Sequence, residues 1–410
     1  MPRSTDALLD RLLAGVEREL PRAVALRRRL HADPELAHAE RRTAARIAAE
    51  LPVECEPAAG TGLLALVDTG DSPAAGPTGE TRAAHSRGLA RGGSIAVRAE
   101  LDGLPVRERT GVEFAATGEA MHACGHDVHM AALVAFTRAA HELREALPAP
   151  LLAVFQPSEE AYPSGAQQLA EGELAALAPA SVLAAHVHPE LPWGSVALDP
   201  GTVNASCDAV EITVEGEPSH GGYPHQGRDP ILAIAQIVVA LHAQLGRRID
   251  PLAAASLTVG VLESGSAENV IPAHARARAA LRAHRPQDRL ALRALVEEVA
   301  VGVAAAHGCR ARVELVAGEP ALANDPRIVG RARGLLGRAG LTSAPEWRSC
   351  GSDDFAFFGA LAPVAMAFVG LAGAPGFVPR PLHHPQMLPP DDAVGAVART
   401  LAVLYLAAGS

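Results

Sequence analysis

The spacing of apolar residues predicts the elements of the chain. LLDRLLAGVEREL and RRTAARIAAEL, within the first fifty residues, have helical spacing and predict two helices. A third helix is expected after residue 126, with Asp127 as its N-cap. Short apolar runs of strand length occur at TGLLALVDTG, SIAVRAEL, PLLAVFQ and SVLAAHVH. Strands that alternate with helices predict an α/β domain with a mostly parallel sheet, whose sites lie at the C-terminal ends of the strands.

A different pattern begins near residue 204. DAVEITVEGE alternates with period two, and the order of the following segments predicts β-α-β-β-α-β, a ferredoxin-like α+β unit. Helix–strand alternation resumes near residue 318. We therefore expect an α/β domain, residues 1–203 and 318–410, interrupted by a small domain, residues 204–317. Residues 70–93 are rich in Gly, Pro, Ser and Thr and predict a surface loop.

Composition narrows the class of protein. A chain of 410 residues fits two domains. The net charge is −10 and no basic stripe is visible, so we expect no nucleic-acid partner. We find neither a signal segment nor an apolar stretch that approaches the ~20 residues of a membrane span, and we expect no membrane partner. The 5 cysteines are scattered and odd in number, which favours a reduced, cytoplasmic protein.

The segment MHACGHDVHM places Cys124 and His126 two residues apart. A thiol nucleophile needs an imidazole that reaches its sulfur, and a redox pair needs a second cysteine close by, which this segment lacks. Thiolate and imidazole are zinc-type ligands, and Gly125 allows a tight bend between them. A metal site therefore suits the pair, although most isolated C-G-H triplets are ordinary polar helix starts.

The segment FQPSEE carries Glu159 and Glu160 directly after an apolar strand. Adjacent side chains diverge, so one carboxylate can bind a metal while its neighbour acts as general base on a metal-held water. Two solvated surface glutamates are the alternative, and the position after a buried strand favours the functional interpretation.

Two histidine doublets complete the set of candidates. LAAHVHPE ends a strand with His186 and His188, and PLHHPQ carries His383 and His384 in a proline-flanked loop. A hydrogen-bonded core histidine and a polar loop are the alternatives. One histidine of each doublet, with the Cys–His pair and one of the glutamates, would form a co-catalytic metal set of nitrogen, sulfur and oxygen ligands.

Nine segments along the chain resemble the M20 metallopeptidase family, in its amidohydrolase branch of hippurate hydrolases, N-acyl-amino-acid amidohydrolases and indole-acetyl-amino-acid hydrolases. They are RRRLHADPELAHAE, VRAELDGLPV, MHACGHDVH, FQPSEE, AAHVHPELPWG, SHGGYPHQGRDPI, AENVIPAHARARAALR, GSDDFAFF and PLHHPQ. The resemblance implies that residues 1–203 and 318–410 form a catalytic metal-binding domain, and that residues 204–317 form a lid and dimerisation domain.

The resemblance also assigns roles to single residues. The positions that match metal ligands are Cys124, His126, Glu160, His186 and His383. Glu159 matches the general base, and Asp102 matches a residue beside the metals. His220 matches a lid histidine that reaches the scissile carbonyl across a dimer. Asn269 and Arg282 fall where lid residues approach the substrate.

The function that follows from the resemblance is hydrolysis of N-acyl amino acids to a carboxylic acid and a free amino acid. We expect two divalent ions per subunit, zinc or manganese, with cobalt and nickel as alternatives. Glu159 would deprotonate a metal-held water and later protonate the leaving amine, while His220 and a metal would stabilise the oxyanion. We expect a homodimer that forms through the lid.

The chain departs from the family pattern at three places. Glu100 in RAELD stands where an aspartate is usual, Asp353 in GSDDF where a glutamate is usual, and the loop at 70–93 looks long. No ligand or base is missing, so we expect an active enzyme. The competing interpretations are a hydrolase of another C–N bond, such as a dipeptide or carbamoyl bond, a catalytically silent binding protein on the same fold, and a thiol enzyme that uses Cys124.

Overall fold

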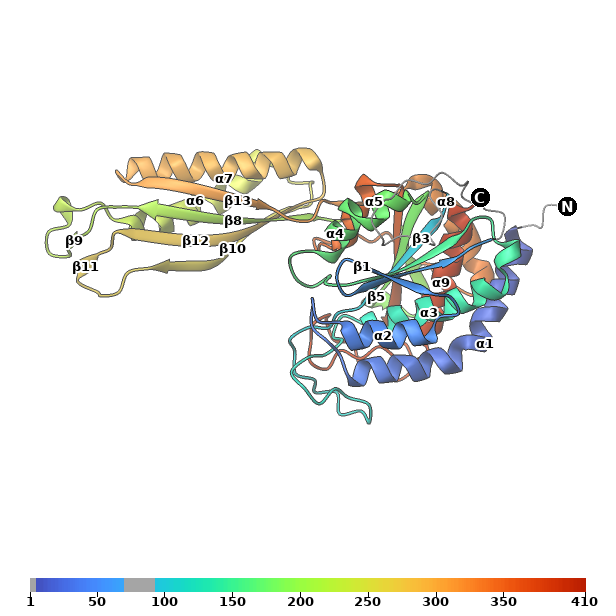
Figure 1. Cartoon of the computed structure of the whole chain (residues 1–410). Helices are drawn as coiled ribbons and strands as arrows, with labels where there is room; N and C mark the ends of the chain where they lie inside the picture. The colour runs from blue at the N-terminus through green and yellow to red at the C-terminus, as the bar shows by residue number, and fades with distance from the viewer. Residues whose placement is uncertain (1–4, 70–92) are drawn as a thin grey trace, which may run out of the picture. The chain divides into compact units, whose positions relative to one another are not determined.

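The computed structural model describes residues 5–69 and 93–410 (Figure 1). All but the last residue of the predicted 70–93 loop lies outside these ranges. The described chain divides into two compact units. One comprises residues up to 201, 323–347 and 357–410, and the other comprises 202–322 and 348–356. The boundaries predicted after 203 and after 317 fall close to this division, and the sequence did not indicate that 348–356 groups with the second unit.

The first unit is built on an eight-stranded sheet in the order β1-β2-β4-β3-β5-β16-β6-β15. Its four central strands, β4, β3, β5 and β16, are parallel, and β2 and β6 run antiparallel to their central neighbours. The strands are β1 (Cys55–Ala58), β2 (Gly62–Val67), β3 (Ile95–Glu100), β4 (Leu151–Gln156), β5 (Ser181–Pro192), β6 (Ser195–Ala197), β15 (Thr342–Ser343) and β16 (Val364–Ala372). Short strands β7 (Gly201–Asn204) and β14 (Leu322–Asn324) occupy the sequence around the unit boundaries.

Helices cover the sheet of the first unit. They are α1 (Thr5–Ala32), α2 (Arg41–Glu50), α3 (His126–Glu142), α4 (Gly165–Glu171), α5 (Glu173–Leu177), α8 (Pro326–Leu336) and α9 (Ala393–Ala408). Figure 1 shows α1, α2 and α3 on one side of the sheet and α4 and α5 on the other. Alternate strand residues such as Val97, Ala153 and Ala367 share one apolar core with α1, α3 and α9, because side chains of a strand alternate between its two faces.

The start of α3 corrects one prediction. Asp127 is not the N-cap, because the helix begins at His126 and its N-cap is Gly125, whose φ is 89°. Glycine adopts this left-handed conformation without the steric cost that a Cβ brings. The Asp127 carboxylate is instead fully buried and accepts a hydrogen bond from Arg27 of α1 at 2.8 Å.

The second unit confirms the predicted ferredoxin-like α+β topology. Its antiparallel sheet has the order β10-β12-β8-β13, and α6 and α7 pack on it. The elements are β8 (Ser206–Glu215), β9 (Ser219–His220), α6 (Pro230–Arg248), β10 (Ala255–Ser264), β11 (Val270–Ile271), β12 (His274–Ala283), α7 (Pro286–Ala306) and β13 (Arg310–Ala317). The Asp229 side chain caps α6 by accepting from the backbone N–H groups of Ile231 and Leu232.

Helix α6 also corrects a prediction. Among the described residues it is the one helix long and apolar enough, by length and composition, to cross a membrane. The expectation that no stretch approaches that length was therefore wrong. Its buried side chains Ala233, Ile234, Ile237 and Leu241 belong to the core of the second unit, which accounts for part of its apolar character.

Four short 3-10 helices complete the elements that the described residues form. They are η1 (Arg144–Ala146), η2 (Pro224–Gln226), η3 (Gly337–Ala339) and η4 (Asp354–Ala360).

Candidate active site

The first unit brings together six side chains that are distant in the sequence. Glu159 and Glu160 follow the C-terminal end of β4, His186 lies on β5, and His383 lies in the loop between β16 and α9. His126 is the first residue of α3, and Cys124 lies two residues before it. The parallel strands end at the same edge of the sheet, which is where open α/β folds place their functional groups.

The six side chains include two groups of possible metal ligands. Cys124, Glu160 and His383 each offer one ligand atom, and these atoms lie within 4.8 Å of one another. His126, Glu159 and Glu160 satisfy the same condition. Nε2 of His383 lies 3.2 Å from a carboxylate oxygen of Glu160, and Nε2 of His126 lies 3.8 Å from one of Glu159. Glu160 belongs to both groups, so it is the residue best placed to serve two cations.

Asp102 orients two of these residues. Its backbone carbonyl accepts a hydrogen bond from Nδ1 of His126 at 2.9 Å, and its carboxylate accepts one from the backbone N–H of Glu160 at 2.9 Å. Nε2 of His126 is buried and has no hydrogen-bond partner among the described residues. An unpaired buried nitrogen is costly unless another group, such as a cation, satisfies it.

His186 lies on the other side of the thiol. Its Nε2 is 3.5 Å from the sulfur of Cys124, and its Nδ1 donates to the backbone carbonyl of Val187 at 2.7 Å. Burial, together with the nearby His129, holds the pKa of His186 well below its usual range. The ring is therefore neutral, and its Nε2 lone pair faces Cys124, as a metal ligand requires.

The electrostatic surroundings of Cys124 favour a bound cation. Burial, followed by the negative charges of Glu160 and Glu159, raises the pKa of this thiol well above its usual range. A divalent cation reverses this situation, because it stabilises a thiolate and offsets the crowded carboxylates. The donor set of sulfur, imidazole nitrogen and carboxylate oxygen thus fits a pair of divalent cations.

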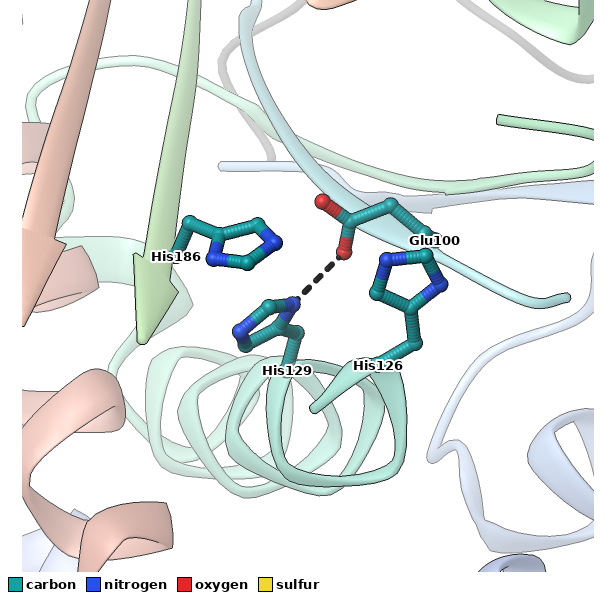
Figure 2. Close-up of side chains that lie close together, drawn as sticks. All are labelled: Glu100, His126, His129 and His186. Atoms are coloured by element: carbon teal, nitrogen blue, oxygen red, sulfur yellow. Dashed lines mark hydrogen bonds and ion pairs between the residues drawn. The ribbon is translucent and has the colours of Figure 1, made fainter. Parts of the chain in front are cut away.

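His129 is a functional candidate that the sequence analysis did not single out. Its Nε2 accepts from the backbone N–H of Val187 at 3.0 Å, so the proton is on Nδ1, which donates to Glu100 at 2.8 Å. Figure 2 shows His129 on α3 between Glu100 and His186. Both ring nitrogens are occupied, so His129 orients its neighbours without being free to bind metal. Its position three residues after His126, on the same helix face, was the available signal.

Glu100, the first departure from the family pattern, is buried and has two partners. Its carboxylate forms an ion pair with Arg98 and accepts the hydrogen bond from His129. Burial raises its pKa, but the charge of Arg98, together with the neighbouring His129 and its hydrogen bond, outweighs that effect and holds the pKa well below its usual range. The second departure, Asp353, lies in the second unit, where it accepts from the backbone N–H of Phe355 at 2.8 Å.

The second histidine of each doublet has other partners. Nδ1 of His384 accepts from the backbone N–H of Gln386 at 3.1 Å. The ring of His188 lies edge-on to Trp347, with the ring centroids 4.8 Å apart. The choice of His186 and His383 over these two residues as metal ligands remains a prediction.

Three predicted residues lie in the second unit. His220 is exposed at the end of β9, and Asn269 is exposed just before β11. The backbone N–H of Gly221 donates to the carbonyl of Asn269 at 2.7 Å, so these two residues are neighbours. Arg282 on β12 donates to the carbonyl of Cys350 at 2.9 Å. Their predicted roles toward the substrate remain predictions.

The fold and the clustered side chains define the class of a metallohydrolase. A family model, described as peptidase family M20/M25/M40, matches residues 96–406. The N-acetyl-L-cysteine deacetylase of Bacillus subtilis is 32% identical over 93% of this chain and 86% of its own. The N-acetyldiaminopimelate deacetylase of Shouchella clausii is 33% identical over 74% of this chain and 79% of its own.

A solved structure gives the same result. It is a dinuclear metal-binding peptidase of the M20 family from Bacillus subtilis, with a TM-score of 0.79, 27% identity, and coverage of 95% of this chain and 98% of that chain. The protein belongs to peptidase family M20/M25/M40. The predicted family, fold class and assignment as a hydrolase are thereby confirmed.

Proposed function

We propose that the protein is a metal-dependent amidohydrolase that cleaves N-acyl amino acids into a carboxylic acid and a free amino acid. The observation that carries this proposal is the pair of ligand groups that share Glu160, with the Glu159 carboxylate beside His126. The deacetylase names of the relatives support an N-acyl amino acid as substrate.

The proposed ligands are Cys124, His126, Glu160, His186 and His383. Two divalent cations bound there would polarise the amide carbonyl and make a water molecule more acidic. Zinc or manganese is our proposal for the metal, with cobalt and nickel as alternatives, because a thiolate favours zinc whereas carboxylate and imidazole ligands suit all four.

Glu159 is the proposed general base. The family resemblance gives it this role, and one of its carboxylate oxygens lies 3.8 Å from Nε2 of the proposed metal ligand His126. Glu159 would accept a proton from the attacking water and later deliver it to the leaving amine nitrogen. Asp102 would hold Glu160 and His126 in place through its two hydrogen bonds.

The second unit is proposed to act as a lid and as the dimer interface. His220 would donate a hydrogen bond to the developing oxyanion, and Asn269 and Arg282 would approach the substrate. Exposed apolar side chains of α6 support an interface there: Ile231 is 43% exposed and Val239 is 69% exposed. Light scattering should give roughly twice the chain mass of 42.3 kDa, and a monomer at micromolar concentration would contradict the dimer.

The test of the function is a substrate panel with the metal-loaded protein. N-acetylcysteine, N-acetyldiaminopimelate, N-benzoyl and indole-acetyl amino acids are compared with dipeptides and carbamoyl amino acids. We expect release of free amino acid from the N-acyl compounds. Preference for dipeptides or carbamoyl compounds, or no turnover with any of the four metals, would contradict the proposal. Loss of activity with iodoacetamide but not with a chelator would indicate a thiol enzyme instead.

Glu159→Gln provides the residue-level check. The variant should lose roughly two to four decades of kcat, as is typical when a general base is removed, and should keep its metal content because the ligands remain. The matched control is Glu190→Gln, which changes an exposed glutamate of the same unit and should leave kcat unchanged. Turnover of Glu159→Gln near that of the unaltered protein would exclude Glu159 as the base.

A further inference from the structure

The segment RRRLHADPELAHAE, residues 27–40, has no role in the chemistry described so far. It ends in Glu40, whose side chain is completely buried. The Glu40 carboxylate accepts hydrogen bonds from the backbone N–H of Ser158 at 2.8 Å and from the hydroxyl of Thr61 at 2.6 Å. The Ser158 hydroxyl lies 3.3 Å from the same carboxylate. This segment therefore contacts the residue that directly precedes Glu159.

The donors to Glu40 are neutral, and no ion pair is found for it within the described ranges 5–69 and 93–410. Burial of a carboxylate without a cationic partner lowers the stability of the folded protein. A role in stability alone therefore does not account for Glu40. Both carboxylate oxygens are used, since Ser158 occupies one and Thr61 the other. A glutamine at this position would present an N–H₂ group to one of these donors.

Ser158 has a strained backbone. Its φ is +52°, in the left-handed region that L side chains rarely adopt, and its side chain is buried. His38 adds two contacts: its backbone N–H donates to the Ser158 hydroxyl oxygen at 2.9 Å, and its Nδ1 lies 2.9 Å from the same oxygen. Left-handed residues of this kind persist only where their surroundings hold them, and they concentrate at functional sites.

The turn between β4 and the two glutamates is thus held from both ends. Asp102 fixes the backbone N–H of Glu160, and Glu40 fixes the backbone N–H of Ser158. Glu159 lies between these two anchors. Its backbone direction, and with it the direction of its side chain, depends on the φ of Ser158.

We propose that Glu40 and His38 are positioning residues that hold Ser158 in its left-handed conformation and thereby direct the Glu159 carboxylate at the reacting centre. This inference rests on the proposed role of Glu159 as general base. Neither residue touches the proposed metal ligands through any contact described above, so their effect reaches the chemistry through Ser158.

The test compares kcat, KM and metal content of Glu40→Gln with those of a matched control. Glu35→Gln changes another buried glutamate of the same segment, which accepts from the backbone N–H and hydroxyl of Thr43 at 2.7 and 3.0 Å. We expect Glu40→Gln to lose at least tenfold in kcat with KM within about twofold and an unchanged metal content. The control should retain its kcat, whatever its loss of thermal stability.

Ser158→Gly separates positioning from a general structural effect. Glycine adopts a φ of +52° without steric cost, so it does not need the contacts from Glu40 and His38 to hold this conformation. Ser158→Gly combined with Glu40→Gln should therefore recover most of the kcat that Glu40→Gln loses. His38→Asn, an exposed position that also has a positive φ, offers a milder variant that should fold if Glu40→Gln does not. It should lower kcat about threefold, and Ser158→Gly should remove that difference.

The outcomes are distinguishable. If Glu40→Gln and Glu35→Gln have equal kcat, or if Ser158→Gly restores nothing in either background, the positioning inference is wrong while the role of Glu159 stands. If Glu159→Gln itself retains full turnover, the proposed base is wrong. In a Glu159→Gln background, Glu40→Gln should have no further effect on kcat, and a full additional loss would also overturn the inference.

Discussion

His129 shows how a single side chain can support a metal site without binding the metal. It joins Glu100 at the end of β3 to the backbone of Val187, which adjoins the proposed ligand His186. The residue thereby fixes the spacing of β3, α3 and β5 around the site. The extra methylene of Glu100, relative to the usual aspartate, is accommodated because its carboxylate reaches both His129 and Arg98.

His129→Ala should weaken metal binding about 10- to 100-fold, the range typical for residues that orient metal ligands. The number of ions bound at saturation should stay at that of the unaltered protein, since no ligand is lost. Metal titration by calorimetry measures both quantities. His141→Ala, near the end of the same helix, is the control and should leave both unchanged. Loss of one bound ion would show that His129 is a ligand, and an unchanged affinity would remove its supporting role.

Helix α1 and the start of α3 are joined by a buried charged network. Arg27 donates to Asp127 at 2.8 Å and to Asp391 at 2.7 Å. Nδ1 of His31 lies 3.0 Å from Asp127, and its Nε2 lies 3.1 Å from Glu108. The network connects the helix that carries His126 to the loop that follows His383, so α1 stabilises two of the elements that form the site.

This network predicts a pH-dependent stability. Burial lowers the pKa of His31, but the charge of Asp127 and the hydrogen bonds to Asp127 and Glu108 outweigh burial and Arg27, and raise the pKa to about 9. The folded state thus binds this proton more tightly than the unfolded chain, whose value is 6.5. The stabilisation is complete below pH 6.5, is lost as the pH rises through about 9, and is on the order of 3 kcal/mol.

The measurement is the thermal midpoint of the metal-free protein between pH 6 and pH 10. The midpoint of the unaltered protein should fall across this range by more than that of His31→Gln, because the variant lacks the proton that is lost. Parallel curves for the two proteins would contradict a charged His31. The buried groups that face this ring are Asp127 of α3, Glu108 of the loop between β3 and α3, and Arg27 of its own helix.

Local sequence patterns predicted the long helices and strands. They failed where a residue's role depends on contacts with residues distant in the sequence. The pattern predicted α1, α3 and the lid strands, because each has a full apolar face. Asp127 was misassigned as an N-cap because its partner, Arg27, lies 100 residues earlier in the chain. Strands β6 and β15 were not predicted. They have only 3 and 2 residues, which is too short for an alternation of apolar and polar residues to be recognised. The role proposed for Glu40 likewise depends on a contact across 118 residues.

At the scale of the whole molecule, the chain inserts a ferredoxin-like unit into an α/β unit that holds all six clustered side chains. The change from mixed spacing to period two near residue 204 was enough to predict this insertion. The grouping of 348–356 with the second unit was not predictable, because it depends on contacts such as that between Arg282 and the Cys350 carbonyl. The segment is too short and irregular to carry a pattern of its own.

The most direct test of the central claim is anomalous diffraction from crystals of the zinc- or manganese-loaded protein, recorded at the absorption edge of the metal. Two peaks should appear in each subunit among the side chains of Cys124, His126, Glu160, His186 and His383, with Glu159 beside them. Peaks at other residues, or no peak among these side chains at saturating metal, would contradict it.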